Sequence, residues 1–142
     1  MTSPGRRWLG RLGRAASAGT DPRHDLGKRG EDLAAAYLRK LGYRIIARRE
    51  KVLRGDLDII ALDDRTVVFV EVRTRSDTLH GHPADTIDRR KQRRIATLAN
   101  AYIRRHRLED CRVRIDVVTV TLAGADGQPD VEHFQDAFES PW

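Results

Sequence analysis

Two runs of strand-forming residues, separated by a short polar loop, constrain the fold of this chain most strongly. The first run is GDLDIIAL (residues 55–62), the second is VVFVEVRTR (residues 67–75), and DDRT lies between them. Val, Ile, Phe and Thr favour strands, and a polar loop of this length favours a chain reversal. The stretch therefore predicts an antiparallel hairpin that carries one acid, Asp58 or Glu71, in the middle of each strand.

The loop also predicts which residues of the hairpin face each other. If the chain reverses symmetrically about the DDRT loop, Ile60 faces Phe69 and Asp58 faces Glu71. Opposed side chains on antiparallel strands have Cβ atoms roughly 4.5 to 5.5 Å apart, and like charges at that distance are destabilising. A protonated acid, an intervening basic side chain or a bridging divalent cation would offset the repulsion.

The same register favours a cation. Arg73, the nearest basic residue, faces Asp56 and therefore has an acid of its own. Mg²⁺ and Mn²⁺ suit a pair of carboxylates, because these ions take oxygen ligands, keep several waters and bind phosphate oxygens. The alternative is a hairpin whose acids point to solvent, since antiparallel sheets often have one wet face.

The rest of the chain alternates helical and strand patterns. LGKRGEDLAAAYLRKLGY predicts a helix from about Leu26 that ends at Gly42, and YRIIARREKV predicts a strand before the hairpin. Residues 84–108 predict a second helix, RVRIDVVTVTL a further strand, and DVEHFQDAF a weaker strand or an extended tail. This order predicts one α/β domain over residues 25–142, preceded by a disordered basic arm over residues 1–24.

Two charged residues interrupt the apolar stripes of the predicted helices. Glu31 projects from the first turn of the first helix toward its buried side, and Lys91 lies between Ile87 and Ile95 in the second. A favourable charge in a first turn explains Glu31 without a catalytic role, and a snorkelling side chain explains Lys91. With Asp58 and Glu71, however, the two residues predict a group of charged side chains around one face of the sheet.

The charge of the chain predicts a polyanionic partner. Lys and Arg number 27 against 21 Asp and Glu, which leaves a net charge of +6 and a pI near 10.1. Basic residues are concentrated in the second helix, where few aromatics accompany them, so we expect contacts with phosphates rather than stacking on bases. A solvated helix face is the alternative. The candidate nucleic-acid contacts are Arg75, Arg89, Arg90, Arg93 and Arg94.

Several other site types are not predicted. The single Cys111 forms no internal disulfide, which favours a reducing compartment and hence the cytoplasm. His80 and His82 follow the hairpin without a third ligand that would complete a zinc site. The sequence has no apolar run near the length of about 18 residues that spans a membrane.

The arrangement of Glu31 on a helix, Asp58 on a strand and Glu71-Val72-Arg73 on the next resembles the PD-(D/E)XK nuclease superfamily. A narrower similarity covers about residues 27–138, where GKRGEDLAAAYLRKLGYRIIARR, GDLDIIA, FVEVRTR, IDRRKQRRIATLANAYI and RIDVV resemble the YraN-like family of small bacterial proteins regarded as endonucleases. The resemblance implies a restriction-endonuclease-like αβββαβ core, with a central mixed sheet flanked by helices.

The resemblance also implies roles for individual residues. Asp58 and Glu71 would hold Mg²⁺ or Mn²⁺ with help from the Val72 carbonyl, and Glu31 would be an accessory acid, as in the archaeal Holliday-junction resolvases. Arg73 stands where the family pattern has lysine, and arginine cannot act as a base. Either Lys91 supplies the missing ammonium group from the second helix, or the site is catalytically weak and the domain binds nucleic acid without cleaving it.

The leading expectation is therefore a metal-dependent endonuclease that acts on DNA, with branched or repair-related DNA among its candidate substrates. The competing expectation is a nucleic-acid-binding domain with the same fold and little or no activity. A sugar-nucleotide transferase ranks lowest, because only the tripeptide Asp56-Leu57-Asp58 favours it and no glycine-rich turn follows the first strand. A homodimer is compatible with the sequence but does not follow from it.

Overall fold

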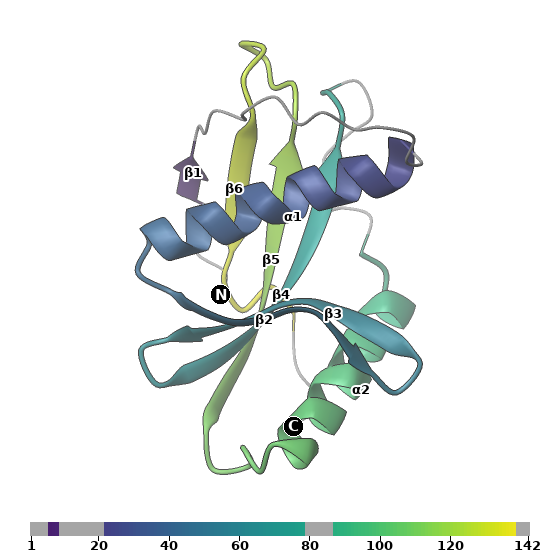
Figure 1. Ribbon diagram of the computed structural model, residues 1–142, viewed down its shortest axis with the longest axis vertical. Helices are drawn as coiled ribbons and strands as arrows, with labels where there is room; N and C mark the ends of the chain where they lie inside the picture. Colours follow the sequence, from purple (N-terminus) through teal and green to yellow (C-terminus); the bar gives the residue numbers. More distant parts are fainter. Residues whose placement is uncertain (1–5, 9–21, 79–86, 139–142) are drawn as a thin grey trace.

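A six-stranded mixed sheet forms the centre of the molecule, and a helix packs on each of its faces (Figure 1). The computed structural model describes residues 6–8, 22–78 and 87–138. The strands lie in the order β1-β6-β5-β4-β3-β2, and β4 and β5 run parallel while the other neighbours are antiparallel. In chain order the elements are β1 (Arg6–Trp8), α1 (Pro22–Lys40), β2 (Arg44–Val52), β3 (Gly55–Asp63), β4 (Thr66–Arg75), α2 (Arg89–Arg105), β5 (Arg112–Thr121) and β6 (Asp130–Phe134).

This architecture confirms the predicted αβββαβ core and the predicted final strand. A parallel neighbour needs a crossover connection, and α2 supplies it between β4 and β5. Gly42 ends the first helix as predicted, because it adopts φ +95°, which other residues rarely adopt. The second helix begins later than predicted, at Arg89, where the Asp88 side chain accepts a hydrogen bond from the Lys91 N–H at 2.8 Å.

The two helices cover opposite faces of the sheet. Alternate residues of β4 show this division, because Val68 and Val70 pack with α1 while Val67 and Phe69 pack with α2. The prediction that Glu31 and Lys91 surround one face of the sheet is therefore wrong. The crossover through α2 covers one face and leaves the other to α1, so the two charged residues approach from opposite sides.

The predicted boundary of the folded part also needs correction. Residues 6–8, which the sequence analysis assigned to a disordered arm, form the edge strand β1 and pair with β6 through Arg6↔His133, Arg7↔Glu132 and Trp8↔Val131. Helix α1 begins at Pro22, three residues before the predicted start of the domain at residue 25. Periodicity could not reveal β1, because a strand of three residues is too short to show any. Residues 1–5 and 9–21 of the predicted arm lie outside the described residues.

Candidate functional site

Asp58 lies where the pairing of β3 with both neighbouring strands is interrupted. The β3–β4 register matches the prediction from Asp63↔Thr66 to Ile59↔Val70, where the ladder ends. Toward β2 the register passes from Arg48↔Ile59 to Glu50↔Leu57, and Arg49, beside the interruption, has φ +48°. The alternation of side chains slips here as well, because Leu57 and Ile60, three residues apart, both pack on the α2 face.

The side chain of Asp58 accepts a hydrogen bond from a backbone N–H of β4, in place of the backbone carbonyl of a paired strand. Its Oδ2 accepts a hydrogen bond from the backbone N–H of Val72 at 2.8 Å. A side chain thus satisfies a backbone donor at the point where β3 and β4 separate. The separation leaves Asp58 half-buried beside the opening of the sheet.

Glu71 lies close to Asp58 at this opening, although the predicted register pair of these two residues falls one step beyond the end of the ladder at Ile59↔Val70. The Glu71 side chain is buried, and its carboxyl group forms a hydrogen bond with that of Asp58. Burial, followed by the nearby charge of Asp58, raises the pKa of Glu71 to about 8, although Lys91 and Arg73 oppose the shift. At neutral pH this raised pKa favours the protonated form of Glu71, which is the response expected of a buried acid beside a like charge.

Lys91 reaches Glu71 from the first turns of α2. Its Nζ lies 3.5 Å from Oε1 of Glu71, and 43% of the Lys91 side chain remains exposed. The predicted inward position of this lysine is confirmed. A long, solvent-screened ion pair does not offset the burial of Glu71, so the pKa of Glu71 stays raised despite this contact.

Glu31 borders a hollow of about 330 Å³ on the α1 side of Asp58. Its carboxylate accepts from Arg48 Nε and from Arg49 Nε, each at 3.1 Å, so two guanidinium groups already neutralise it. Within the part of the chain that the structure describes, no three acidic, His or Cys side chains are grouped to hold a metal ion. The hollow is lined by Arg23, His24, Leu26, Gly27, Glu31, Arg49, Asp58, Val72 and Thr74.

Arg73 is close enough to Glu71 for its charge to lower the pKa of that acid. The predicted cross-strand position of Asp56 opposite Arg73 is wrong, because the β3–β4 ladder ends before reaching either residue. Asp56 lies opposite Lys51 of β2 instead. The loss of pairing at Asp58 is the physical reason, since β3 continues toward its own hairpin turn with β2 and leaves β4.

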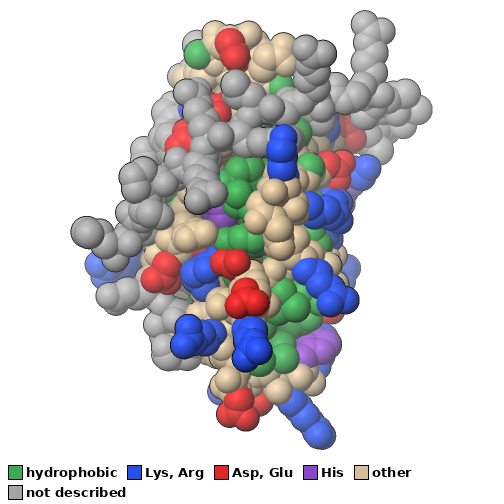
Figure 2. Space-filling view, turned by 90° about the vertical axis from the view of Figure 1, so that its left-hand side faces the viewer, with side chains coloured by type: hydrophobic (Ala, Val, Ile, Leu, Met, Phe, Trp, Pro, Cys, Tyr) green, Lys and Arg blue, Asp and Glu red, His purple; other side chains and the backbone are tan. Residues whose placement is uncertain are grey.

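The candidate nucleic-acid contacts fall into two groups. Arg89, Arg90 and Arg93 are exposed on α2. Arg75 and Arg94 also make intramolecular bonds: Arg75 Nε donates to Thr121 Oγ1 at 2.9 Å, and Arg94 Nη2 donates to the carbonyl of Arg54 at 3.0 Å. Basic and acidic side chains are interspersed on the side of the molecule in Figure 2. His80 and His82 lie outside the described residues.

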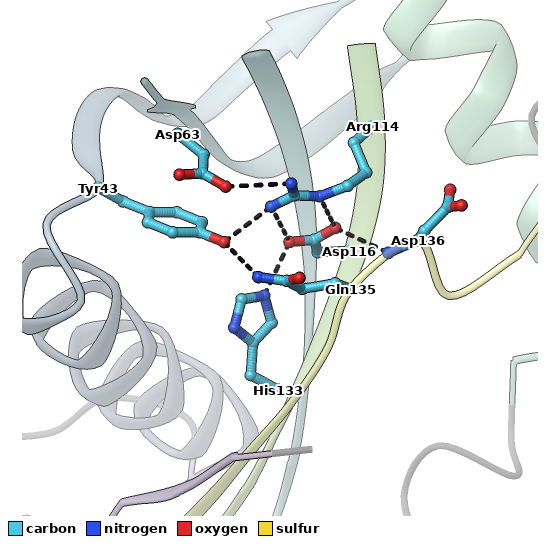
Figure 3. Close-up of polar contacts among 7 residues, drawn as sticks. All are labelled: Tyr43, Asp63, Arg114, Asp116, His133, Gln135 and Asp136. Carbon is cyan, nitrogen blue, oxygen red and sulfur yellow. Dashed lines mark hydrogen bonds and ion pairs between the residues drawn. The ribbon is translucent and has the colours of Figure 1, made fainter. Parts of the chain in front are cut away.

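A buried polar cluster that was not predicted surrounds Asp116, on the strand next to Glu71 (Figure 3). The Asp116 carboxylate, fully buried, is 2.7 Å from His133 Nε2 and 2.7 Å from Arg114 Nε, and it accepts from the Asp136 N–H at 3.0 Å. Burial favours the neutral acid, but the bonds from His133 and Arg114 prevail and lower the pKa of Asp116. The pattern RID was the available signal, because residues two apart on a strand share a face.

The cluster extends to the end of α1 through Tyr43. Its hydroxyl accepts from Arg114 Nη2 at 2.7 Å and from Gln135 Nε2 at 2.9 Å, while Arg114 Nη1 lies 3.1 Å from Asp63. Burial, together with the charges of Asp116 and Asp63, raises the pKa of Tyr43 to about 12, although the charge of Arg114 acts in the opposite direction. These bonds connect β3, β5 and β6, so the cluster acts as a brace within the fold.

The αβββαβ core and mixed sheet place the chain among proteins with a restriction-endonuclease-like fold. Comparison with known proteins adds the family. Residues 30–120 match the uncharacterised protein family UPF0102, and the chain belongs to this YraN-like family. No helix among the described residues is long and apolar enough to cross a membrane.

Bacterial relatives match most of the chain. A UPF0102 protein of Prosthecochloris aestuarii is 44% identical over 119 residues, which cover 81% of this chain and 94% of the relative. One from Geobacter sulfurreducens is 46% identical over 114 residues, covering 80% and 88%. One from Arthrobacter sp. is 46% identical over 111 residues, covering 78% and 92%. The similarity therefore extends over nearly the whole length of these proteins.

Proposed function

We propose that this protein is a divalent-metal-dependent endonuclease that hydrolyses phosphodiester bonds in DNA, with Asp58 and Glu71 as its metal ligands. The observation that carries the proposal is the meeting of these two carboxyl groups at the opening of the sheet. Their hydrogen bond and the raised pKa of Glu71, about 8, express a charge conflict that a bound cation would relieve. The single cysteine favours a cytoplasmic location for this activity.

Mg²⁺ and Mn²⁺ fit the residues present. Mg²⁺ typically binds one or two carboxylates and completes its coordination with waters and substrate phosphate oxygens. Asp58 and Glu71 supply two carboxylates, and the Val72 carbonyl is a further candidate ligand. When bound, the ion would lower the pKa of a water molecule and stabilise charge on the phosphate.

Two basic residues near Glu71 would together perform the roles of the lysine in the family pattern, namely phosphate orientation and proton exchange. Arg73 stays charged and suits orientation of phosphate oxygens through paired N–H groups. Lys91, whose Nζ approaches Glu71 to 3.5 Å, is the residue that can exchange a proton with an attacking water. The exposed Arg89, Arg90 and Arg93 on the same helix would hold the phosphate backbone beside the acids.

A second candidate function is binding of DNA without cleavage. The specific observation in its favour is Arg73 in the position of the usual lysine, since a permanently charged group cannot act as a base. The exposed cations of α2 would serve this function equally well.

Calorimetric titration with Mg²⁺ and Mn²⁺, combined with cleavage assays on linear and branched DNA, separates the two functions. We expect Asp58→Asn to weaken metal binding and to slow cleavage at least about 100-fold, equivalent to ~2.7 kcal/mol. Asp64→Asn is the matched control, because this exposed acid lies at the far end of the same hairpin. DNA binding without metal binding or cleavage would establish the second function, and full activity of Asp58→Asn would refute the assigned site.

A pair of α2 variants tests the role of Lys91. We expect Lys91→Met to reduce cleavage by about 100-fold, the lower end of the contribution of general acid–base catalysis. Lys91→Arg should not restore activity if proton exchange is required, and Arg93→Met, which removes an exposed cation two residues away, should affect DNA binding only. If Lys91→Arg is as active as the wild type, Lys91 contributes only its positive charge and does not exchange a proton.

A further inference from the structure

The turn between β2 and β3 exposes an apolar side chain in a strained conformation. Leu53 is 66% exposed, the most of any large hydrophobic residue in the described parts of the chain. Its φ is +53°, in the left-handed region, which costs an ordinary L-residue roughly 1 to 2 kcal/mol. At the equivalent position of the β3–β4 turn, Asp64 has φ +54°, and aspartate tolerates this conformation better. Leu53 is therefore unfavourable for folding on two counts.

The turn that carries Leu53 is held rigidly against α2. Arg94 Nη2 donates to the Arg54 carbonyl at 3.0 Å. Gly55 packs so closely that a Cβ atom there would lie 2.8 Å from Leu98 Cδ1 and 3.0 Å from Arg94 Nη2. Val52, the residue before Leu53, is fully buried. The Leu53 side chain consequently projects from a fixed base.

The turn lies near the acid pair. Helix α2 contacts both, because Lys91 approaches Glu71 and Arg94 bonds the turn, and three residues of helix span about 4.5 Å. Along β3, Gly55 and Asp58 are three residues apart, or about 10 Å. The turn, the start of α1 and the start of α2 lie on the same right-hand side of Figure 1. The separation from turn to acids thus corresponds to about three base steps of DNA.

Cations lie beside this leucine. Lys51 and Arg54 flank it in the hairpin and are exposed, and Arg94 of α2 bonds the Arg54 carbonyl. An isolated exposed leucine needs no explanation by itself. A rigid, strained leucine among cations has the composition of the apolar wedges that enter DNA between base steps while basic residues hold the phosphates.

We propose that Leu53 is a wedge that contacts an unstacked base of branched DNA, about three base steps from the acid pair. Continuous duplex is the poorer ligand, because inserting a wedge there requires unstacking, at a cost of a few kcal/mol per step. A branch point already presents an unstacked base face. This inference builds on the proposed function by naming its substrate class, but the binding it describes does not require cleavage.

Binding assays in EDTA test the wedge separately from catalysis. We compare fluorescence anisotropy of a four-way junction and a linear duplex with wild type, Leu53→Asn and Ile46→Thr. Leu53→Asn removes the apolar side chain with a residue that tolerates positive φ, and Ile46, 45% exposed in β2, is the matched control. We expect Leu53→Asn to weaken junction binding about tenfold with under about twofold change for duplex, the scale of one lost base contact. Ile46→Thr should change neither.

Three results would overturn the inference. They are equal affinity of the wild type for junction and duplex, unchanged junction binding by Leu53→Asn, and a change of oligomeric state in Leu53→Asn with unchanged DNA binding. If Leu53-dependent junction binding persists in EDTA while no metal supports cleavage, the endonuclease proposal fails and the wedge stands.

Discussion

Glu71 and Asp116 are buried acids on the neighbouring strands β4 and β5, yet their pKa values move in opposite directions. Burial and the charge of Asp58 raise the pKa of Glu71 to about 8. Burial acts in the same direction on Asp116, but the donors of His133, Arg114 and the Asp136 backbone outweigh it. The parallel register places Glu71 beside Val117, one residue after Asp116, so the two acids belong to opposite faces of the sheet.

This difference in pKa indicates different roles. Asp116 stabilises the fold, whereas Glu71 belongs to the candidate metal site. Asp116 receives enough hydrogen bonds to remain ionised inside the protein, and its partners connect several strands. Glu71 has a second acid as its hydrogen-bond partner and an ion pair with the partly exposed Lys91 at 3.5 Å. A buried acid whose pKa stays raised despite its cationic neighbours is a candidate for an external cation, whereas an acid that its donors keep ionised serves the fold.

The largest expected effect is on stability at Asp116. Asp116→Asn leaves the Arg114 guanidinium partly buried without its main counter-charge, so we expect a loss of about 3 to 5 kcal/mol in the free energy of unfolding. Urea denaturation at pH 7 measures the loss. Asp58→Asn is the matched variant, and we expect it to cost little or to stabilise, because it removes a charge that opposes Glu71. Equal losses in the two variants would contradict the distinction between brace and ligand site.

The pH dependence of stability should reveal Glu71 next. Its pKa rises from 4.5 in the unfolded chain to about 8 in the folded protein, so the folded state keeps a proton that the unfolded state has lost. The free energy of unfolding should therefore fall as pH rises from 4.5 to 8, by at most about 1.4 kcal/mol per pH unit. Glu71→Gln should flatten this slope.

The contribution of Asp116 to the free energy of unfolding should depend on pH in the opposite direction. Its pKa lies below 3.8 in the folded protein, so its contribution is present above pH 3.8 and is lost as pH falls below that value. Chemical denaturation of wild type and Glu71→Gln across roughly pH 3 to 9 measures the free energy of unfolding over the ranges in which Asp116 and Glu71 titrate. A slope between pH 4.5 and 8 that Glu71→Gln leaves unchanged would show that Glu71 is ionised throughout.

The smallest expected effect concerns Glu31, which has features of both sites. Arg48 and Arg49 satisfy its carboxylate, as donors satisfy Asp116, yet it lines the same hollow as Asp58. Glu31→Gln should cost about 1 to 2 kcal/mol of stability, because the two guanidinium groups are partly exposed and can rehydrate. We expect it to reduce cleavage less than tenfold. A reduction as large as that of Asp58→Asn would make Glu31 part of the metal site.

Much of the site followed from local patterns. Strand periodicity and an even loop predicted that Asp58 and Glu71 lie close together, and helical periodicity placed Lys91 on the inward side of α2. The face that each helix covers did not follow, because that depends on the crossover from β4 to β5. Asp116 was overlooked because its partners His133 and Asp136 are distant in the sequence, and no spacing rule connects them.

The sequence by itself determined the order of helices and strands, the hairpin register and the meeting of two like charges. These depend on interactions between residues close in the chain, where periodicity and turn length act directly. The tertiary structure decided that β3 leaves β4 at Asp58, that the pKa of Glu71 is raised, and that Leu53 lies on a turn held against α2. Each of these depends on burial and on contacts between distant segments, which arise only when α1 and α2 close over the two faces of the sheet.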